Sequence, residues 1–206
     1  PWKIKKPLII AGGGVRISNQ VKFFLNFVNK NKLPFATTWP SQDITSSDNK
    51  LYFGSVGKHA HLSASILASK ADLIITLGVR FSPKIVCNKF AKKAKLIAID
   101  IDSSELNEGL INPDVKLKCP ISYFLKKSKK FKVHVNKDWI QKCKKIKLDN
   151  FRNFTELKKF KSKYVNPYFF TERLSKFVKN NAILLTDAGA NLTFFMQAFR
   201  SKKNQR

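Results

Sequence analysis

The run Pro7-Leu-Ile-Ile-Ala-Gly-Gly-Gly14 is apolar throughout and stops at three consecutive glycines. Continuous apolarity without alternation is typical of a strand that is buried on both faces, as in a parallel sheet. Similar runs recur further along the first half of the chain, at 33–38, 72–77 and 95–100. Because helical patterns lie between these runs, the spacing predicts βαβ units and an α/β fold with a doubly wound, mostly parallel sheet.

Two helices are predicted among these strands. Ser18 is expected to cap the first helix, and residues 61–69 are expected to form the second. The first has an apolar stripe at helical spacing, made of Val21, Phe24, Leu25 and Val28. A stripe of this kind is typical of a helix that packs against a core.

The pattern changes in the second half of the chain. From about residue 126 to 163 the sequence is rich in lysine, and it predicts one helix near 138–147 but no strand, so this stretch is interpreted as a solvated connector. Asn166-Pro167 is a helix start signal. Residues 182–186 read as another buried strand, and a helical pattern follows them.

Three parts are therefore predicted: a Rossmann-like central domain at 1–130, a Lys-rich connector at 131–165, and the start of a second α/β domain at 166–206. One helix and one strand cannot bury a core alone. The sequence also begins Pro-Trp-Lys rather than with methionine. We therefore expect the chain to be a piece of a longer protein, in which the second domain continues.

Charge is the most unusual feature of the composition. The 206 residues contain 40 Lys or Arg and 13 Asp or Glu, a formal net charge of +27. Of these, 17 basic and 3 acidic residues lie between positions 116 and 163, in a stretch that we interpret mainly as Lys-rich surface. Lysine predominates over the arginine that nucleic-acid readers use for bidentate contacts, so nucleic acid is not the expected partner.

Cysteine usage and hydropathy exclude further classes of protein. Cys87, Cys119 and Cys143 are odd in number and widely spaced, which is typical of reduced thiols in a cytoplasmic protein rather than of a disulfide framework. The three histidines lack metal-ligand spacing with nearby carboxylates, so no metal site is expected within this chain. No apolar run approaches 18 residues, so no membrane-spanning helix is expected.

Candidate ligand-binding residues gather at the predicted strand ends. In an open α/β sheet, ligands bind beyond the carboxyl ends of the strands. The turns at that edge are 12–14, 37–38, 78–80 and 100–102. Glycine lets a backbone approach a phosphate closely, and an acidic residue after a strand can bind ribose hydroxyls. Together the turns suggest a nucleotide cleft, although glycines that merely make tight turns explain the spacing equally well.

The sequence shows no nucleophile elbow and no pair of catalytic carboxylates. His59 and His61 are interpreted as loop or packing residues rather than as bases. If the protein is an enzyme, its reacting groups lie elsewhere or belong to a cofactor.

Five segments of the first domain occur in a recognisable order. They read Pro7-Leu-Ile-Ile-Ala-Gly-Gly-Gly14, Leu33-Pro-Phe-Ala-Thr-Thr38, Leu51-Tyr-Phe-Gly-Ser-Val-Gly-Lys-His59, Ala71-Asp-Leu-Ile-Ile-Thr-Leu-Gly-Val-Arg80 and Ile99-Asp-Ile-Asp102. This order resembles the central domain of thiamine-diphosphate enzymes, in particular acetolactate synthase large subunits. Asn166-Pro-Tyr168 and Leu185-Thr-Asp-Ala-Gly-Ala-Asn191 resemble the start of the diphosphate-binding C-terminal domain of the same enzymes.

The resemblance implies thiamine diphosphate as a cofactor, with its diphosphate on Gly189, Ala190 and Asn191. The ligands of its Mg²⁺ and the catalytic glutamate would lie outside this chain. It also implies that the central-domain cleft holds FAD, an ADP-like nucleotide, or nothing. The residues that would contact such a nucleotide are Gly13, Gly14, Thr38, Trp39, Gly57, His59, Gly78, Val79, Arg80, Asp100 and Ile101.

The chain departs from acetolactate synthases at three places. Ser82-Pro83-Lys84 stands where those enzymes have Asp-Asp-Arg, Cys119-Pro120 replaces Gly-Asp after a strand at 116–118, and Ala190-Asn191 replaces Gln-His. Lysine is not equivalent to arginine at a bidentate phosphate site. A relative of these enzymes that uses another 2-oxo acid or another acceptor therefore stays open beside acetolactate synthesis itself.

The activity implied by the resemblance is that of a thiamine-diphosphate-dependent transferase or lyase. A 2-oxo acid such as pyruvate would lose CO₂, leave a hydroxyethyl group on the cofactor and be joined to a second carbonyl compound. We expect a homodimer or homotetramer, and no activity from this chain by itself. Two alternatives stay open: an NAD-type nucleotide-binding α/β domain, and a Lys-rich module that binds a polyanion.

Overall fold

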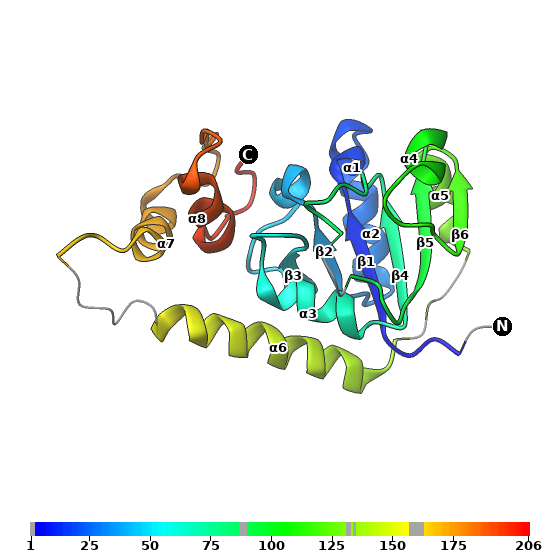
Figure 1. Cartoon of the computed structure of the whole chain (residues 1–206), viewed down its shortest axis with the longest axis horizontal. Helices are drawn as coiled ribbons and strands as arrows, with labels where there is room; N and C mark the ends of the chain where they lie inside the picture. The colour runs from blue at the N-terminus through cyan, green and yellow to red at the C-terminus, as the bar shows by residue number, and fades with distance from the viewer. Residues whose placement is uncertain (1–2, 87–89, 131–132, 134, 157–162) are drawn as a thin grey trace.

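A six-stranded, wholly parallel sheet forms the centre of the first domain, and helices cover both of its faces (Figure 1). The computed structural model describes residues 3–86, 90–130, 133, 135–156 and 163–206, so the thiol of Cys87 lies outside the described residues. The strands are β1 (Pro7–Ala11), β2 (Phe35–Thr37), β3 (Tyr52–Ser55), β4 (Leu73–Leu77), β5 (Lys95–Asp100) and β6 (Val115–Lys118). Their order across the sheet, β3-β2-β1-β4-β5-β6, confirms the doubly wound α/β fold.

Helices connect the strands and continue beyond the sheet. They are α1 (Gly13–Ile17), α2 (Val21–Lys30), the 3₁₀ helix η1 (Trp39–Ile44), α3 (Leu62–Lys70), α4 (Ser103–Asn107), α5 (Ile121–Ser128), α6 (Lys137–Glu156), α7 (Pro167–Phe177) and α8 (Ala190–Ala198). Even α6, with its 20 residues, is too polar to cross a membrane, and the other helices of the described part of the chain are no better suited.

The four strands that the apolar runs predict in the first domain are confirmed, and so is the strand at 116–118. β3 was not predicted because its four residues contain a glycine and a serine rather than an unbroken apolar run. The prediction that Ser18 caps the first helix is wrong. Ser18 instead ends α1, where its hydroxyl donates to the Gly14 carbonyl (2.7 Å), and α2 begins after Gln20.

The side chains of β1 alternate between two cores, as the pleat of a strand requires. Leu8 and Ile10 belong to a cluster that includes residues of α3 and α6. Ile9 and Ala11 belong to a second cluster that includes residues of α2 and α5. All four side chains are fully buried, which explains why the run shows no polar alternation.

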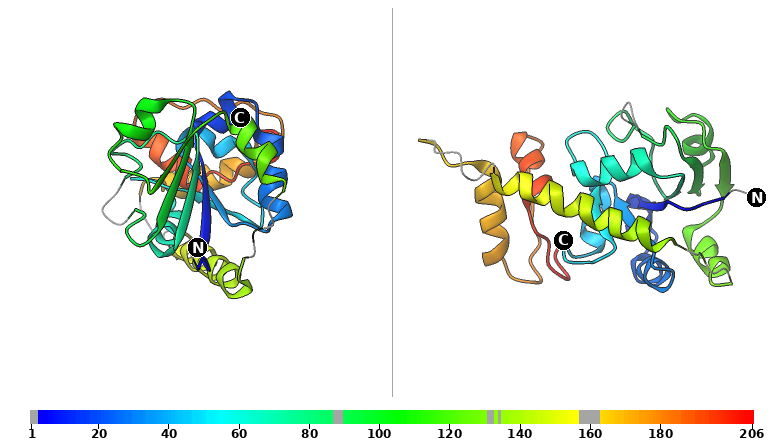
Figure 2. Two further views of the ribbon diagram at one scale, coloured as in Figure 1. Left: turned by 90° about the vertical axis from the view of Figure 1, so that its right-hand side faces the viewer. Right: turned by 90° about the horizontal axis from the view of Figure 1, so that it is seen from below.

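Helix α6 corrects the prediction of a solvated connector at 131–165. It packs along α3 and the β3 edge of the sheet (Figure 1, Figure 2), and its residues Trp139 and Cys143 are completely or almost completely buried. The Trp139 indole N–H donates to the Pro7 carbonyl at 2.9 Å. The lysine-rich composition conceals this buried stripe, because a few positions spaced by four suffice to anchor a helix.

The segment after α6 contains one confirmed prediction and one wrong one. Asn166 caps α7, since its side-chain oxygen accepts from the backbone N–H groups of Tyr168 (2.9 Å) and Phe169 (3.3 Å). The buried strand predicted at 182–186 is not formed, and Leu185 is 93% exposed. Arg206 exchanges backbone hydrogen bonds with residues 182 and 184, and the Ala182 N–H donates to the nearby Lys179 carbonyl at 3.2 Å. Ile183 is likewise 73% exposed, whereas Ala182 and Leu184 are half-buried, so only one side of this segment is covered by the described residues.

Candidate functional site

The carboxyl ends of β1 and β4 lie side by side where the strand order reverses, which is the position at which open α/β sheets bind ligands. The turns that follow the two strands touch each other. Gly12 N donates to the Leu77 carbonyl at 2.9 Å, and Gly14 N donates to the Gly78 carbonyl at 3.2 Å. The structure therefore brings together the 12–14 and 78–80 turns that the sequence singled out.

The close approach of the turns accounts for three of their glycines. A Cβ on Gly12 would lie 1.8 Å from the Gly78 carbonyl oxygen, and a Cβ on Gly78 would lie 2.6 Å from Gly14 Cα. Gly78 also has a φ of +60°, which other residues adopt with strain. A Cβ on Gly13, in contrast, would meet only Pro40 Cβ, at 3.3 Å. Packing therefore requires glycine at 12, 14 and 78 but not at 13.

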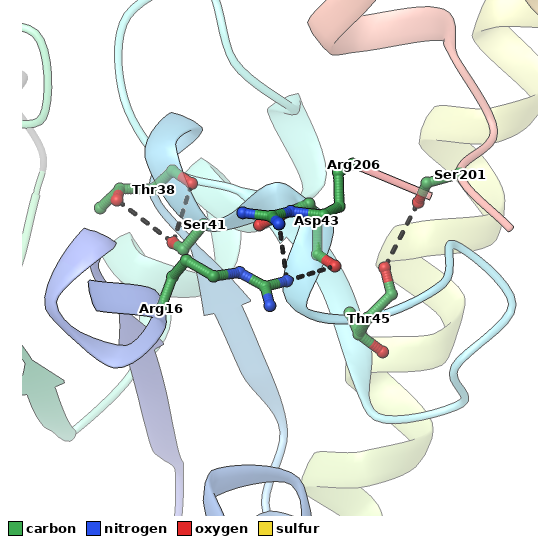
Figure 3. Close-up of polar contacts among 7 residues, drawn as sticks. All are labelled: Arg16, Thr38, Ser41, Asp43, Thr45, Ser201 and Arg206. Carbon is green, nitrogen blue, oxygen red and sulfur yellow. Dashed lines mark hydrogen bonds and ion pairs between the residues drawn. The ribbon is translucent and has the colours of Figure 1, made fainter. Parts of the chain in front are cut away.

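The end of β2 joins this edge through hydrogen bonds inside the protein. The buried Thr38 donates its backbone N–H to the Ala11 carbonyl at 2.9 Å. Its hydroxyl lies 3.4 Å from that of Ser41 (Figure 3). The Ser41 hydroxyl donates to the same Ala11 carbonyl at 2.6 Å. Thr38 thus fixes the start of η1 against β1.

The loop after β3 carries Gly57 and His59. Gly57 has a φ of +120°, and a Cβ there would lie 2.5 Å from the Lys84 carbonyl oxygen. The neighbouring Lys58 N donates to that same carbonyl at 2.6 Å. The exposed His59 offers its backbone carbonyl to the Gln197 side chain at 2.8 Å. This loop therefore lies between the 82–85 turn and α8 rather than against the glycines of the β1 turn.

The charged residues of the edge have partners within the chain. Arg80 Nε lies 2.9 Å from Glu105 Oε1, with the arginine side chain 83% exposed. Asp100 accepts from the Asp102 N–H at 3.0 Å, and Asp102 accepts from the Ser104 N–H at 2.9 Å as the N-cap of α4. The acidic pair predicted to bind ribose thus begins a helix.

Two apolar residues complete the predicted nucleotide contacts. Val79 is a core residue with 3% of its surface exposed, so it can offer only backbone groups to a ligand, whereas Ile101 is 68% exposed. The edge therefore fits a nucleotide in part: Arg80 and Ile101 are open to solvent, but the carboxylates and the Gly14 N–H are already engaged.

The turn that begins α8 has a different character, because residues 185–191 are all exposed. Gly189 is the N-cap of α8, and its N–H donates to the Asp187 carboxylate at 3.4 Å. The same carboxylate accepts from the Asn191 side-chain amide. Backbone N–H groups at the start of a helix suit a diphosphate, which would replace Asp187 as the acceptor.

In the part of the chain that the structure describes, no three His, Cys, Asp or Glu side chains form a group that could hold a metal ion.

A partly buried cluster of basic side chains joins all three parts of the chain, and sequence reasoning missed it. Lys147 of α6 donates to the carbonyls of Ser47 (3.1 Å) and Tyr52 (2.7 Å). Burial, followed by the charge of Arg200, lowers the pKa of Lys147 to about 8. The spacing of Trp139, Cys143 and Lys147, four residues apart on one helix, is the signal that could have revealed this buried face.

His61, at the start of α3, belongs to the same cluster. Its Nδ1 accepts from the backbone N–H of Ser55 at 3.1 Å. Burial lowers the pKa of His61 to about 4, and the charges of Arg200 and Lys147 act in the same direction. His61 is therefore neutral at pH 7 and is a packing residue, as the sequence predicted.

Asp43 links the central domain to the end of the chain. Arg16 Nη2 approaches Asp43 Oδ2 at 2.8 Å and donates to the Asp43 carbonyl at 3.0 Å, while Arg206 Nε lies 3.9 Å from the same carboxylate (Figure 3). Ser201 adds a backbone hydrogen bond to the Ser47 hydroxyl at 3.0 Å. The 163–206 segment is thus docked on the central domain through η1 and the loop that follows it.

Comparison with known proteins identifies the family to which the chain is similar. The family described as "Thiamine pyrophosphate enzyme, central domain" matches residues 2–127. The acetolactate synthase large subunit of Lactococcus lactis is 32% identical over 204 residues, which cover 96% of this chain and 34% of that protein. The probable acetolactate synthase large subunit of Methanococcus aeolicus is 29% identical over 214 residues, covering 96% of this chain and 36% of the relative.

A third relative has a different name. The 3D-(3,5/4)-trihydroxycyclohexane-1,2-dione hydrolase of Geobacillus thermodenitrificans is 34% identical over 116 residues, which cover 54% of this chain and 18% of that protein. The chain spans about a third of the length of the acetolactate synthase subunits that it matches. The six-stranded fold and the family match agree over the same residues, so residues 2–127 are a central domain of this kind, and the chain belongs to the thiamine pyrophosphate enzyme family.

Proposed function

We propose that this chain is part of an acetolactate-synthase-like enzyme that decarboxylates a 2-oxo acid and joins the product to a second carbonyl compound. The observation that carries the proposal is the similarity to acetolactate synthase large subunits over 96% of the chain, continuing from the central domain through α6 to α8. Pyruvate, or a related 2-oxo acid, is the substrate class.

The residues present fit one end of thiamine diphosphate. Gly189, Ala190 and Asn191 would hold the diphosphate at the exposed start of α8, after Asp187 gives way as the acceptor of the Gly189 N–H. When bound, the cofactor supplies the carbanion that the reaction requires. The ligands of its Mg²⁺ would come from polypeptide equivalent to the rest of the relatives.

The chain's own contribution would then be to position this turn. The hydrogen bonds of Gln197 to the His59 carbonyl and of Ser201 to Ser47 hold the C-terminal end of α8, and thereby the helix that the turn begins, against the central domain. We therefore propose that the central domain acts as a scaffold for the diphosphate turn, that the complete enzyme is a homodimer or homotetramer, and that the chain has no turnover by itself. The buried Cys143 and the free Cys119 suit a cytoplasmic setting.

A nucleotide at the β1–β4 edge is a separate proposal. FAD or an ADP-like molecule would contact Arg80 and Ile101 and would have to compete with Glu105 for the Arg80 guanidinium. An absorption spectrum of the purified complete enzyme decides between a flavin and no flavin.

The activity is tested by replacing the matching segment of the Lactococcus lactis subunit with residues 7–206 of this chain. The chimera is expected to form acetolactate from pyruvate, thiamine diphosphate and Mg²⁺, detected as acetoin after acid treatment, while the 206-residue chain forms none. Circular dichroism and binding of thiamine diphosphate show whether the chimera is folded and loaded. A folded and loaded chimera that releases CO₂ from no 2-oxo acid would contradict the proposal.

The alternative of an NAD-type domain receives no support from the family match, which is to thiamine pyrophosphate enzymes. Affinity of the chain for a polyanion that falls steeply with salt would favour the remaining alternative, a polyanion-binding module.

A further inference from the structure

A cavity of about 170 Å³ lies between η1 and the 184–206 segment. Trp39, Asp43 and Tyr52 line it from the central domain, and Phe195, Phe199 and Arg206 line it from the end of the chain. It shares no lining residue with the 12–14, 78–80 and 100–102 turns, all of which the structure describes. Apart from Trp39, which the resemblance implies as a nucleotide contact, its lining residues are therefore distinct from those of the nucleotide edge and of the diphosphate turn at 189–191.

One wall of the cavity is apolar and aromatic. The rings of Phe195 and Phe199 stack with their centroids 4.5 Å apart, and Met196 and Leu184 line the cavity beside them. Since a water molecule in the liquid takes up about 30 Å³, the space suits a ligand of about six non-hydrogen atoms. Such a ligand would place a short hydrocarbon chain on this wall.

Trp39 brings a hydrogen-bond donor without an acceptor. Its indole Nε1 is buried, and none of the described residues accepts its proton. Buried N–H groups in folded proteins are almost always paired, so an orphan on a cavity wall points to an acceptor supplied from outside the chain. The other tryptophan described, Trp139, donates to the Pro7 carbonyl and shows the usual arrangement.

The charge beside Trp39 favours an anion. Asp43 and Arg206 line the cavity, and Arg16, which is not itself a lining residue, approaches the same Asp43 carboxylate as Arg206 (Figure 3). Arg16 Nε is also buried without an acceptor among the described residues. Two guanidinium groups against one carboxylate leave one positive charge, which a second carboxylate would balance through charge-assisted hydrogen bonds.

We propose that this cavity binds a small monocarboxylate, with its short apolar chain on Phe195 and Phe199 and its carboxylate on the Trp39 N–H beside the Arg16–Asp43–Arg206 group. The ligand would touch both the central domain and the 184–206 segment, so its binding would stabilise their docking. This inference stands independently of the activity proposed above.

The test follows the tryptophan indole N–H signals of the 206-residue chain by ¹H–¹⁵N NMR during titration with isobutyrate. The chain has three tryptophans, and Trp39→Phe identifies the signal of Trp39. That signal is expected to shift and saturate with a dissociation constant on the order of 10 mM, as suits so small a ligand, while the Trp139 signal stays in place. Isobutyramide has the same shape without the charge and is expected to bind at least about tenfold more weakly.

Two substitutions are expected to change the affinity in opposite directions. Asp43→Asn removes the competing carboxylate and should tighten isobutyrate binding about threefold or more, whereas Arg16→Gln should weaken it by a similar factor. Asp72→Asn removes a carboxylate that accepts from the backbone of residues 5 and 6 at the far end of the sheet, and it should leave the affinity unchanged. The spectra themselves report whether each variant is folded.

The absence of a saturable Trp39 shift would overturn the proposal and leave the cavity to water. Equal affinity for isobutyrate and isobutyramide would overturn it as well, because the charge would then have no role. If Asp43→Asn and Arg16→Gln both weaken binding, a general loosening of the docked segment explains the result, and the assignment of the anion site fails.

Discussion

Trp139 in the middle of the chain donates its indole N–H to the backbone carbonyl of Pro7, 132 positions away, at 2.9 Å. This bond ties α6 to the first strand of the sheet. Trp139→Ala is expected to lower the free energy of unfolding by about 3–5 kcal/mol, because it removes a large buried side chain and its hydrogen bond. Trp139→Phe keeps most of the packing and should cost about 1–2 kcal/mol.

Urea denaturation followed by circular dichroism measures both changes. Leu148→Ala, on the same helix but 49% exposed, is the matched control and should change the stability by less than about 1 kcal/mol. Equal effects of Trp139→Ala and Leu148→Ala would show that α6 is not anchored to the core as described.

The contact between the β1 and β4 turns leads to a second prediction. Gly78→Ala should destabilise the chain by about 2 kcal/mol or more, since its φ is +60° and the new Cβ would lie 2.6 Å from Gly14 Cα. Gly13→Ala meets only the side chain of Pro40 at 3.3 Å and should cost less than about 1 kcal/mol. Thermal denaturation of the two variants compares them directly, and similar losses would contradict the packing explanation for Gly78.

His61 predicts a pH dependence of stability. Its pKa is about 4 in the folded chain, against the ordinary 6.5, because the ring is buried beside basic groups. The unfolded chain therefore binds a proton at higher pH than the folded one, so stability falls as the pH drops from about 6.5 towards 4. Between pH 7 and pH 5 this residue should account for a loss on the order of 2 kcal/mol.

His61→Gln should flatten that part of the curve, measured as the urea midpoint at a series of pH values. His59→Gln changes an exposed histidine two positions away and should leave the curve as it is. A slope that survives in His61→Gln would mean that other groups, such as buried carboxylates, control stability in this range.

Lys147 provides the fourth prediction. Lys147→Met retains the apolar stem but leaves the Ser47 and Tyr52 carbonyls without this donor, so a loss of about 1–3 kcal/mol is expected. Lys145→Met, at an exposed position on the same helix, is the matched control and should change little. Hydrogen exchange should show faster exchange in the 45–53 loop for Lys147→Met alone, and protection equal to that of the control would contradict the role given to Lys147.

The local sequence predicted those elements whose identity depends on near neighbours. The largely apolar runs at 7–11, 72–77 and 95–100 identify buried strands because a parallel sheet covers both faces of each strand. Asn166-Pro167 identifies a helix start because the Asn166 cap and the fixed φ of proline act within one turn. The order of such motifs along the chain was also enough to indicate the family.

Long-range contacts determined the rest. Residues 182–186 look like a buried strand in the sequence, yet a strand in the interior of a sheet has neighbours on both sides, and the described chain places only Arg206 alongside these residues. In the sequence, Lys147 of α6 looks like a lysine in solvent. In the fold its side chain is partly buried, and its ammonium group donates to the carbonyls of Ser47 and Tyr52. No local pattern pairs Asp43 with both Arg16 and Arg206 either. By its apolar runs, caps and motif order, the sequence alone determined the α/β sheet and the family. Which polar groups lose their water was decided by the tertiary structure, because that depends on segments that are distant in the sequence and are brought together by the fold.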